Sequence, residues 1–213
     1  MADLAFVLDS SSSRSSDGWN ALLHYVTSLI TVNQLPIGGK VRVAVVVYGS
    51  PATVVVTFNQ YSDISGLTNA VLGANYVGGS ANLSDALSQT LTVFQTARQN
   101  VLRIAIVFVG GSAQGNLSSI VSNANTLKDN ANNVKIIPID ISASIDLTSI
   151  GSVSPKLISN YIQLNNYNQL DFLTSVIFGD INSFVCTSSL NGSSFYTASR
   201  LLSKSVCSKL FRK

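Results

Sequence analysis

The sequence predicts an α/β domain: a doubly wound, Rossmann-like, mainly parallel six-stranded sheet with helices on both faces and one short antiparallel edge strand. Short apolar runs alternate with longer segments of helical spacing, which is typical of parallel strands joined by crossover helices. The run Leu4-Ala5-Phe6-Val7-Leu8 is apolar throughout, which indicates a strand covered on both faces. The connection 49–52 is too short for a crossover, so the strand after it must run antiparallel.

The individual elements follow from two periodicities. Continuous apolar runs predict the strands, and apolar residues spaced three and four apart predict the helices. The predicted strands are 3–8, 41–48, 53–58, 102–109, 134–141 and 161–164; the predicted helices are 18–32, 62–72, 83–97, 117–130 and 170–185, with a helical turn at 145–150. We expect one domain over residues 1–186, followed by a Ser-rich and then basic tail over residues 187–213.

The composition argues against several classes of protein. Hydrophobic residues make up 46% of the chain and charged residues 11%, which suits a folded domain with a large core. The net charge of +3 arises in the tail, because residues 1–186 hold eight basic and ten acidic side chains. This near-neutral body is unlike a nucleic-acid-binding domain. No apolar run reaches about 18 residues, so no transmembrane segment is expected, and the strand at 3–8 leaves no room for a signal peptide in this chain.

A hydroxyl-rich motif follows the first predicted strand. Asp9-Ser10-Ser11-Ser12-Ser13 has the form Asp-x-Ser-x-Ser. With Arg42 to Tyr48, with Tyr76-Val77-Gly78-Gly79 and with Ala86-Leu87, it resembles von Willebrand factor type A domains of the extracellular-matrix type. The resemblance covers roughly residues 3–186, with the motifs in the family's order and spacing.

The resemblance implies a metal-ion-dependent adhesion site, and this chain departs from it. Asp9, Ser11 and Ser13 match three of its ligands, and oxygen ligands of this kind suit Mg²⁺ or Ca²⁺. The family adds a Thr and a second Asp, where this chain has Ala81 and Gly110. Ser80 is the candidate replacement for the Thr. We therefore expect weak binding of Mg²⁺ or Ca²⁺, or none. The alternative is that the Asp and serines only cap the following helix.

The implied function is binding. We expect a secreted, non-enzymatic matrix or adhesion module whose partners are matrix or cell-surface proteins, collagen among them. A divalent-cation-dependent adhesion domain and a self-associating structural component of a byssal or mineralised tissue are the alternatives. An enzyme is disfavoured because the only histidine, His24, falls inside a predicted helix. The expected ligand-binding face contains Ser10, Ser12, Gly79, Ser80, Asn82, Gly110, Gly111 and Ser112.

Two further groups of residues bear on secretion. Sequons begin at Asn82, Asn116 and Asn191, which makes these residues glycosylation candidates. In the family, a Cys at the position of Cys186 often pairs with one before the first strand, and this chain has none there. Cys186 either lost that partner, pairs with Cys207, or is a free or intermolecular thiol.

Overall fold

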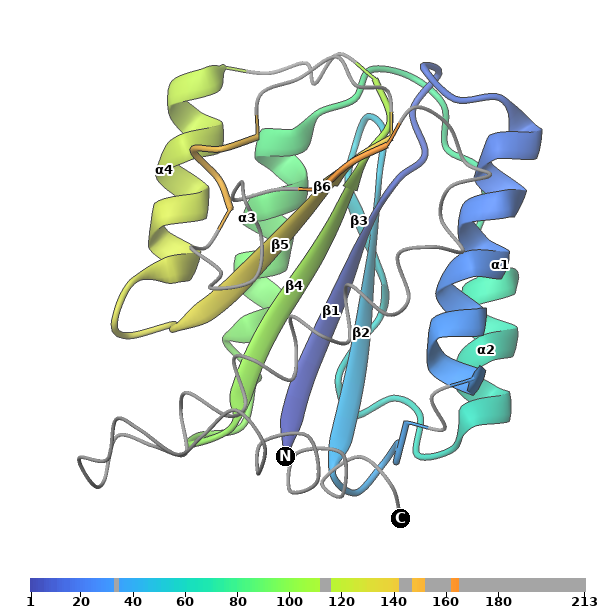
Figure 1. Cartoon of the computed structure of the whole chain (residues 1–213), viewed down its shortest axis with the longest axis vertical. Helices are drawn as coiled ribbons and strands as arrows, with labels where there is room; N and C mark the ends of the chain where they lie inside the picture. Colours follow the sequence, from blue (N-terminus) through green and yellow to red (C-terminus); the bar gives the residue numbers. More distant parts are fainter. Residues whose placement is uncertain (33–34, 112–115, 142–146, 152–161, 165–213) are drawn as a thin grey trace, which may run out of the picture.

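The computed structural model describes residues 1–32, 35–111, 116–141, 147–151 and 162–164. Within these residues a single sheet has the strand order β3-β2-β1-β4-β5-β6 (Figure 1). The elements, in chain order, are β1 (Ala2–Asp9), α1 (Ser16–Val32), β2 (Val41–Tyr48), β3 (Thr53–Val56), α2 (Ile64–Leu72), α3 (Leu83–Phe94), β4 (Leu102–Val109), α4 (Leu117–Lys128), β5 (Val134–Asp140) and β6 (Ile162–Gln163).

The predicted mainly parallel sheet with one antiparallel edge strand is confirmed. Strand β1 lies at the centre and pairs in parallel with β2 on one side and β4 on the other. Strands β5 and β6 continue the parallel sheet, and β3 pairs antiparallel with β2 at the opposite edge. The strand order therefore switches direction between β1 and β4, and ligands of doubly wound sheets bind beside the carboxyl ends of such strands.

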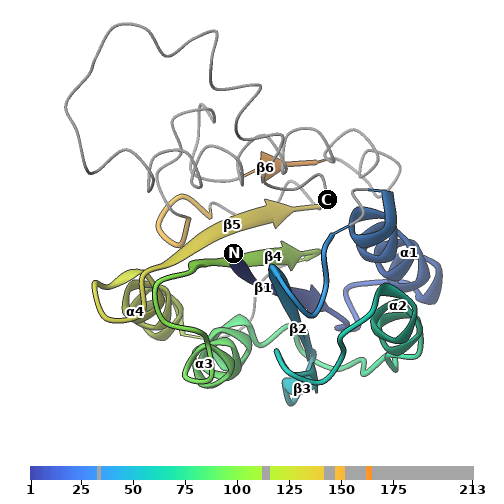
Figure 2. The same ribbon diagram turned by 90° about the horizontal axis from the view of Figure 1, so that it is seen from below.

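Two apolar layers hold the sheet between helices. Successive side chains of β1 point to opposite faces, so Leu4, Phe6 and Leu8 pack toward α1 and α2, whereas Ala5 and Val7 pack toward α3 and α4. Figure 2 shows the two helix pairs on opposite sides of the strands. Each large apolar side chain buried in this way contributes about 1.5–3 kcal/mol to folding.

The predicted elements appear in the predicted order, and they differ mainly at their ends. Strand β3 stops at Val56 although Phe58 is apolar, because Phe58 has left the ladder and packs its ring 5.3 Å from that of Phe94. Helix α2 starts at Ile64 because Asp63 caps it, accepting from Gly66 N at 2.7 Å. Residues 147–151 form a turn. The predicted helix 170–185, the boundary at 186 and the tail lie outside the described residues.

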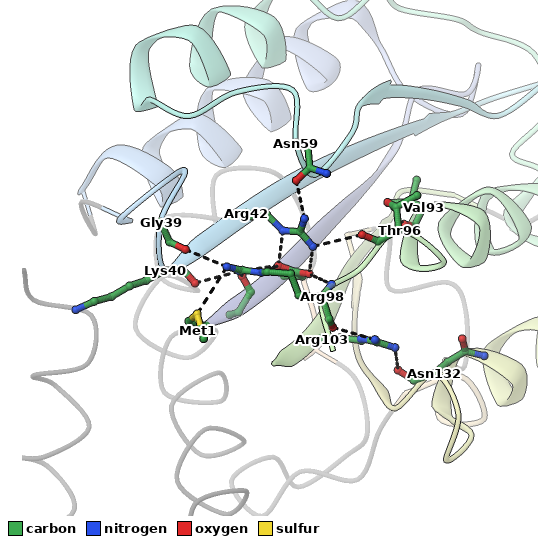
Figure 3. Close-up of polar contacts among 12 residues, drawn as sticks. Met1, Gly39, Lys40, Arg42, Asn59, Val93, Thr96, Arg98, Arg103 and Asn132 are labelled. Carbon is green, nitrogen blue, oxygen red and sulfur yellow. Dashed lines mark hydrogen bonds and ion pairs between the residues drawn. The ribbon is translucent and has the colours of Figure 1, made fainter. Parts of the chain in front are cut away.

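The amino end of β1 is joined to its neighbours by an arginine cluster (Figure 3). Asp3 is fully buried and accepts from Arg42 Nε at 2.9 Å and from Arg98 Nη2 at 2.7 Å. Arg98 also donates through its backbone N to Asp3 Oδ2 at 2.8 Å. The cluster therefore ties the segment after α3 to the centre of the sheet.

No helix within the described part of the chain has the length and hydropathy needed to cross a membrane.

Candidate functional site at the carboxyl end of the central strands

Asp9 is the last residue of β1, and it faces the end of β4 at the switch in strand order. Its side chain is completely buried. One carboxylate oxygen, Oδ1, accepts from Ser11 N at 2.9 Å. The other, Oδ2, accepts from Gly110 N at 2.8 Å. The carboxylate thus fastens the loop after β1 to the residue after β4.

The positive charge beside Asp9 comes from Arg14, in the same loop. Arg14 N donates to Ser11 O at 3.0 Å, which turns the chain back toward the sheet. The Arg14 Nε lies 3.6 Å from Asp9 Oδ2, and both side chains are 0% exposed. Burial lowers the pKa of the Arg14 guanidinium, and the negative charge of Asp9 opposes this shift. An arginine stays protonated in proteins, so the pair is ionic.

Two glycines make room for this arrangement. A Cβ atom on Gly110 would overlap the guanidinium of Arg14, and a Cβ atom on Gly111 would overlap the side chain of Ser13. Loop 10–14 can therefore close over the end of β4 only because neither position carries a side chain.

Two further buried polar groups surround the ion pair. Tyr48 is fully buried at the end of β2 and donates its hydroxyl to Phe108 O at 2.9 Å. Burial and the charge of Asp9 raise the pKa of Tyr48 well above its usual value. Asp140 is fully buried at the end of β5. Because β4 lies between β1 and β5, Asp140 is not an immediate neighbour of Asp9, but its charge favours protonated Arg14.

A second loop, residues 76–80, is hydrogen-bonded to loop 10–14. Ser10 Oγ accepts from Val77 N at 2.6 Å, and Ser12 exchanges two bonds of 2.8 Å with Gly79. The hydroxyl of Tyr76 donates to Ser11 O at 3.1 Å or Arg14 O at 2.8 Å. These hydrogen bonds hold the two loops together. We call the surface formed by residues 10–14, 76–82 and 110–111 the upper face.

The structure places the predicted site residues as follows. Ser11 Oγ and Ser13 Oγ lie 2.5 Å apart and share a hydrogen bond. Ser80 is exposed, and Ala81 is buried in the core between the sheet and α3. Asn82 and Asn116 cap α3 and α4, each accepting a backbone hydrogen bond through its side chain. Ser112, Asn191, Cys186 and Cys207 lie outside the described residues.

Arg14 is the residue that the sequence interpretation missed. It stands immediately after the Asp-x-Ser-x-Ser motif, and the chain has a glycine where the family has its second carboxylate. A cation directly after the motif, in a chain that has no carboxylate at residue 110, is the signal that could have identified it. Neither Arg14 nor Gly110 indicates this role by itself, because only the fold brings residues 14 and 110 together.

The residues present do not fit a divalent cation. Asp9 matches the family's metal-binding carboxylate, but it is already paired with the buried guanidinium of Arg14. Residue 110 is a glycine, so it provides no second carboxylate. A dication beside Asp9 would be repelled by Arg14 at short range. Within the part of the chain that the structure describes, no group of three or more His, Cys, Asp or Glu side chains could hold a metal ion.

Comparison with known proteins agrees with this architecture. The family model for the von Willebrand factor type A domain matches residues 3–175. The collagen alpha-4(VI) chain of Mus musculus is 28% identical over 169 residues, covering 79% of this chain and 7% of that protein. The von Willebrand factor A domain-containing protein 2 of Xenopus laevis is 30% identical over 172 residues, covering 78% and 21% respectively. The chain thus spans a small part of these relatives.

Solved structures show the same fold. Proximal thread matrix protein 1 from the mussel byssus superposes with a TM-score of 0.72 at 19% identity, over 83% of this chain and 44% of that one. Another structure of that protein, with zinc in its MIDAS motif, superposes with a TM-score of 0.69 at 19% identity over the same shares of the two chains. Similarity at this level of identity establishes the architecture and leaves the role of each site to its own residues.

Proposed function

The chain belongs to the von Willebrand factor type A domain family, and on that premise we propose that it is a non-enzymatic extracellular matrix or adhesion module. In this proposal the upper face binds other matrix or cell-surface proteins, with collagen-like proteins as the first candidates, and binding does not require a divalent cation. Support for the matrix setting comes from the relatives, which include a collagen VI chain.

One observation carries the choice of the upper face. The two loops that form it are cross-linked by hydrogen bonds and still present apolar surface, since Tyr76 is 41% and Val77 is 40% exposed. The Tyr76 ring is anchored through its hydroxyl to loop 10–14. A fixed aromatic side chain beside exposed hydroxyl groups loses little conformational entropy on binding, and such residues often dominate protein interfaces.

The polar groups at the same site favour binding over catalysis. Asp9 and Arg14 are enclosed and hold each other, so neither is available to a substrate. His24 is exposed on α1, in its third turn, and α1 begins only after the site loop. General base catalysis needs a base within hydrogen-bond reach of the proton it removes. Among the described residues of the upper face we find no arrangement of this kind.

The binding experiment uses two matched substitutions. Binding of the chain to immobilised fibrillar collagen and collagen VI is measured by surface plasmon resonance, with Mg²⁺ and again with EDTA. Ser80→Arg places a bulky charge on the upper face, and Ser65→Arg places the same charge on an exposed residue of α2 near the opposite end of the sheet. We expect Ser80→Arg to weaken binding about tenfold or more, and Ser65→Arg and EDTA to leave it unchanged.

Other outcomes point to the alternatives. Binding that disappears in EDTA would establish a cation-dependent adhesion domain instead. Equal loss of binding in Ser80→Arg and Ser65→Arg would show that the contact does not lie specifically on the upper face. A third outcome is that the chain binds only to immobilised copies of itself and also shows a dimer or larger species in analytical ultracentrifugation. This result would favour a self-associating structural component.

The extracellular location has its own test. Asn116 is exposed, whereas Asn82 is half-buried at the start of α3. In protein purified from its natural source, we expect a glycan at Asn116 more often than at Asn82, detected by mass spectrometry of peptides. Unmodified Asn82, Asn116 and Asn191 in material known to be fully processed would argue against passage through the secretory route.

A further inference from the structure

We propose that Arg14 is the resident cation of this site: its guanidinium takes the place of the divalent ion and makes the upper face independent of metal. The proposal deepens the proposed function by naming the cause of its metal independence. Its test needs no binding partner, so each of the two proposals can fail without the other.

The first argument is positional. A side chain on residue 110 would start in the space that the Arg14 guanidinium fills, because a Cβ atom there overlaps three guanidinium atoms. By the family resemblance, residue 110 is the position of the second metal-binding carboxylate. The guanidinium therefore fills the region from which that carboxylate would act.

The second argument concerns charge. Asp9 is buried, and a buried carboxylate needs a compensating positive charge. Arg14 supplies that charge from five residues along the chain, with Nε 3.6 Å from Asp9 Oδ2 and no exposure of either side chain. Asp140, also buried, adds further negative charge that favours the protonated arginine. The positive charge is thus supplied by the fold itself.

The third argument concerns the remaining oxygen ligands. The hydroxyl groups of Ser11 and Ser13 are hydrogen-bonded to each other. Because Gly111 has no side chain, Ser13 can pack against the end of β4. A bound dication would need these oxygens and would have to displace a guanidinium side chain that is 0% exposed. Arg14 as a residue is only 4% exposed. It therefore offers no open position to an acidic group of a ligand, and binding at this face does not require one.

Thermal melting in EDTA, Mg²⁺ and Mn²⁺ tests the proposal. For the natural chain and for Arg14→Lys, which keeps a cation in the loop, we expect shifts in Tm below about 1 °C. For the double variant Arg14→Ala, Gly110→Asp, the carboxylate returns and the guanidinium is removed. We expect its Tm in EDTA to fall below that of the natural chain, and saturating Mn²⁺ to raise it by about 5 °C or more.

Adding Asp9→Asn to the double variant should abolish the response to Mn²⁺, because the ion then loses a carboxylate. The proposal is overturned if the natural chain gains stability from Mg²⁺ or Mn²⁺ and Asp9→Asn removes that gain. It is also overturned if the double variant shows no response to either ion, whether it is folded or unfolded in EDTA. Gly110→Asp alone should stay insensitive to metal, since Arg14 still fills the space, and a metal response in that variant would likewise contradict us.

Discussion

The central strand β1 has a buried aspartate near each end, and the two are neutralised in different ways. At the amino end, Asp3 is bound by Arg42 and Arg98, whose side chains are 11% and 25% exposed. At the carboxyl end, Asp9 is paired with Arg14, and neither side chain is exposed. The first cluster is a set of hydrogen bonds shared between two partly exposed arginines, whereas the second is an enclosed ion pair.

The difference shows how burial changes the contribution of an arginine to stability. Two arginines bind the same buried carboxylate at the amino end, so Asp3 keeps one guanidinium when the other is removed. In the enclosed pair, removing Arg14 leaves Asp9 charged in a medium of low polarity, without a second arginine on its carboxylate in the described contacts. We therefore expect similar substitutions to have unequal effects at the two ends of β1.

The largest difference should appear when each arginine is replaced by methionine, which keeps length and removes charge. We expect Arg14→Met to cost about 3–5 kcal/mol of unfolding free energy, because Asp9 stays buried without its counter-charge. Arg42→Met should cost about 1 kcal/mol, because Arg98 still binds Asp3. Urea unfolding followed by circular dichroism measures both. Equal costs would show that exposure does not separate the two clusters.

A smaller effect is expected from Gly110→Ala. The added methyl group overlaps the Arg14 guanidinium, so we expect a cost of about 1–3 kcal/mol from overpacking. In an Arg14→Ala background the same change should be close to neutral, because the overlapping atoms are gone. A double-mutant cycle in urea isolates this coupling. A coupling near zero would mean that residue 110 and the guanidinium do not share the same space.

The cluster at the amino end should be sensitive to acid. Burial raises the pKa of Asp3, but hydrogen bonds from Arg42 and Arg98 outweigh burial and hold the pKa below its usual value of 3.8. The unfolded chain then binds the proton more tightly, so the stabilisation is complete above the unfolded pKa and is lost as pH falls through the folded pKa.

Urea unfolding of the natural chain and of Asp3→Asn, at a series of pH values, measures this contribution. The stability difference between them should be constant above about pH 5 and should shrink below about pH 4. A difference that grows on acidification would contradict the direction of the shift.

The smallest expected effect is that of salt. Raising the ionic strength from about 0.1 M to about 1 M shortens the Debye length from about 10 Å to about 3 Å. The cost of Arg98→Met should therefore fall by a few tenths of a kcal/mol, at a side chain that is 25% exposed. The cost of Arg14→Met should change less, since solvent ions do not reach that pair. The same urea series in two salt concentrations distinguishes the two behaviours.

The fold could be predicted from the sequence because its signals are local. Continuous apolar strands, helical spacing and the short connection at 49–52 each determine an element or a direction without knowledge of distant contacts. The antiparallel edge strand followed from these rules and is confirmed. Element ends were less predictable, since Phe58 is apolar for reasons of packing and not of strand pairing.

The site could be predicted only in part. The resemblance identified Asp9, Ser11 and Ser13 and the two departures at Ala81 and Gly110, because motifs are visible in sequence. The role of Arg14 was not visible, because it depends on a contact between residues that β4 and the crossovers bring together. The arginine cluster around Asp3 was missed for the same reason, since Arg98 lies 95 positions along the chain from Asp3.

The covalent attachment of Arg14 has a consequence for competition. A dissolved ion meets the site at its bulk concentration, whereas a side chain five residues from its carboxylate is presented at an effective concentration set by a short tether, on the order of millimolar or above. The loop bonds to Tyr76 and Gly79 restrict that tether further. If Arg14 is the resident cation, as we propose, we expect chelators and changes in ion supply to leave occupancy unchanged. Each molecule would then carry one cation at this site from the moment the domain folds.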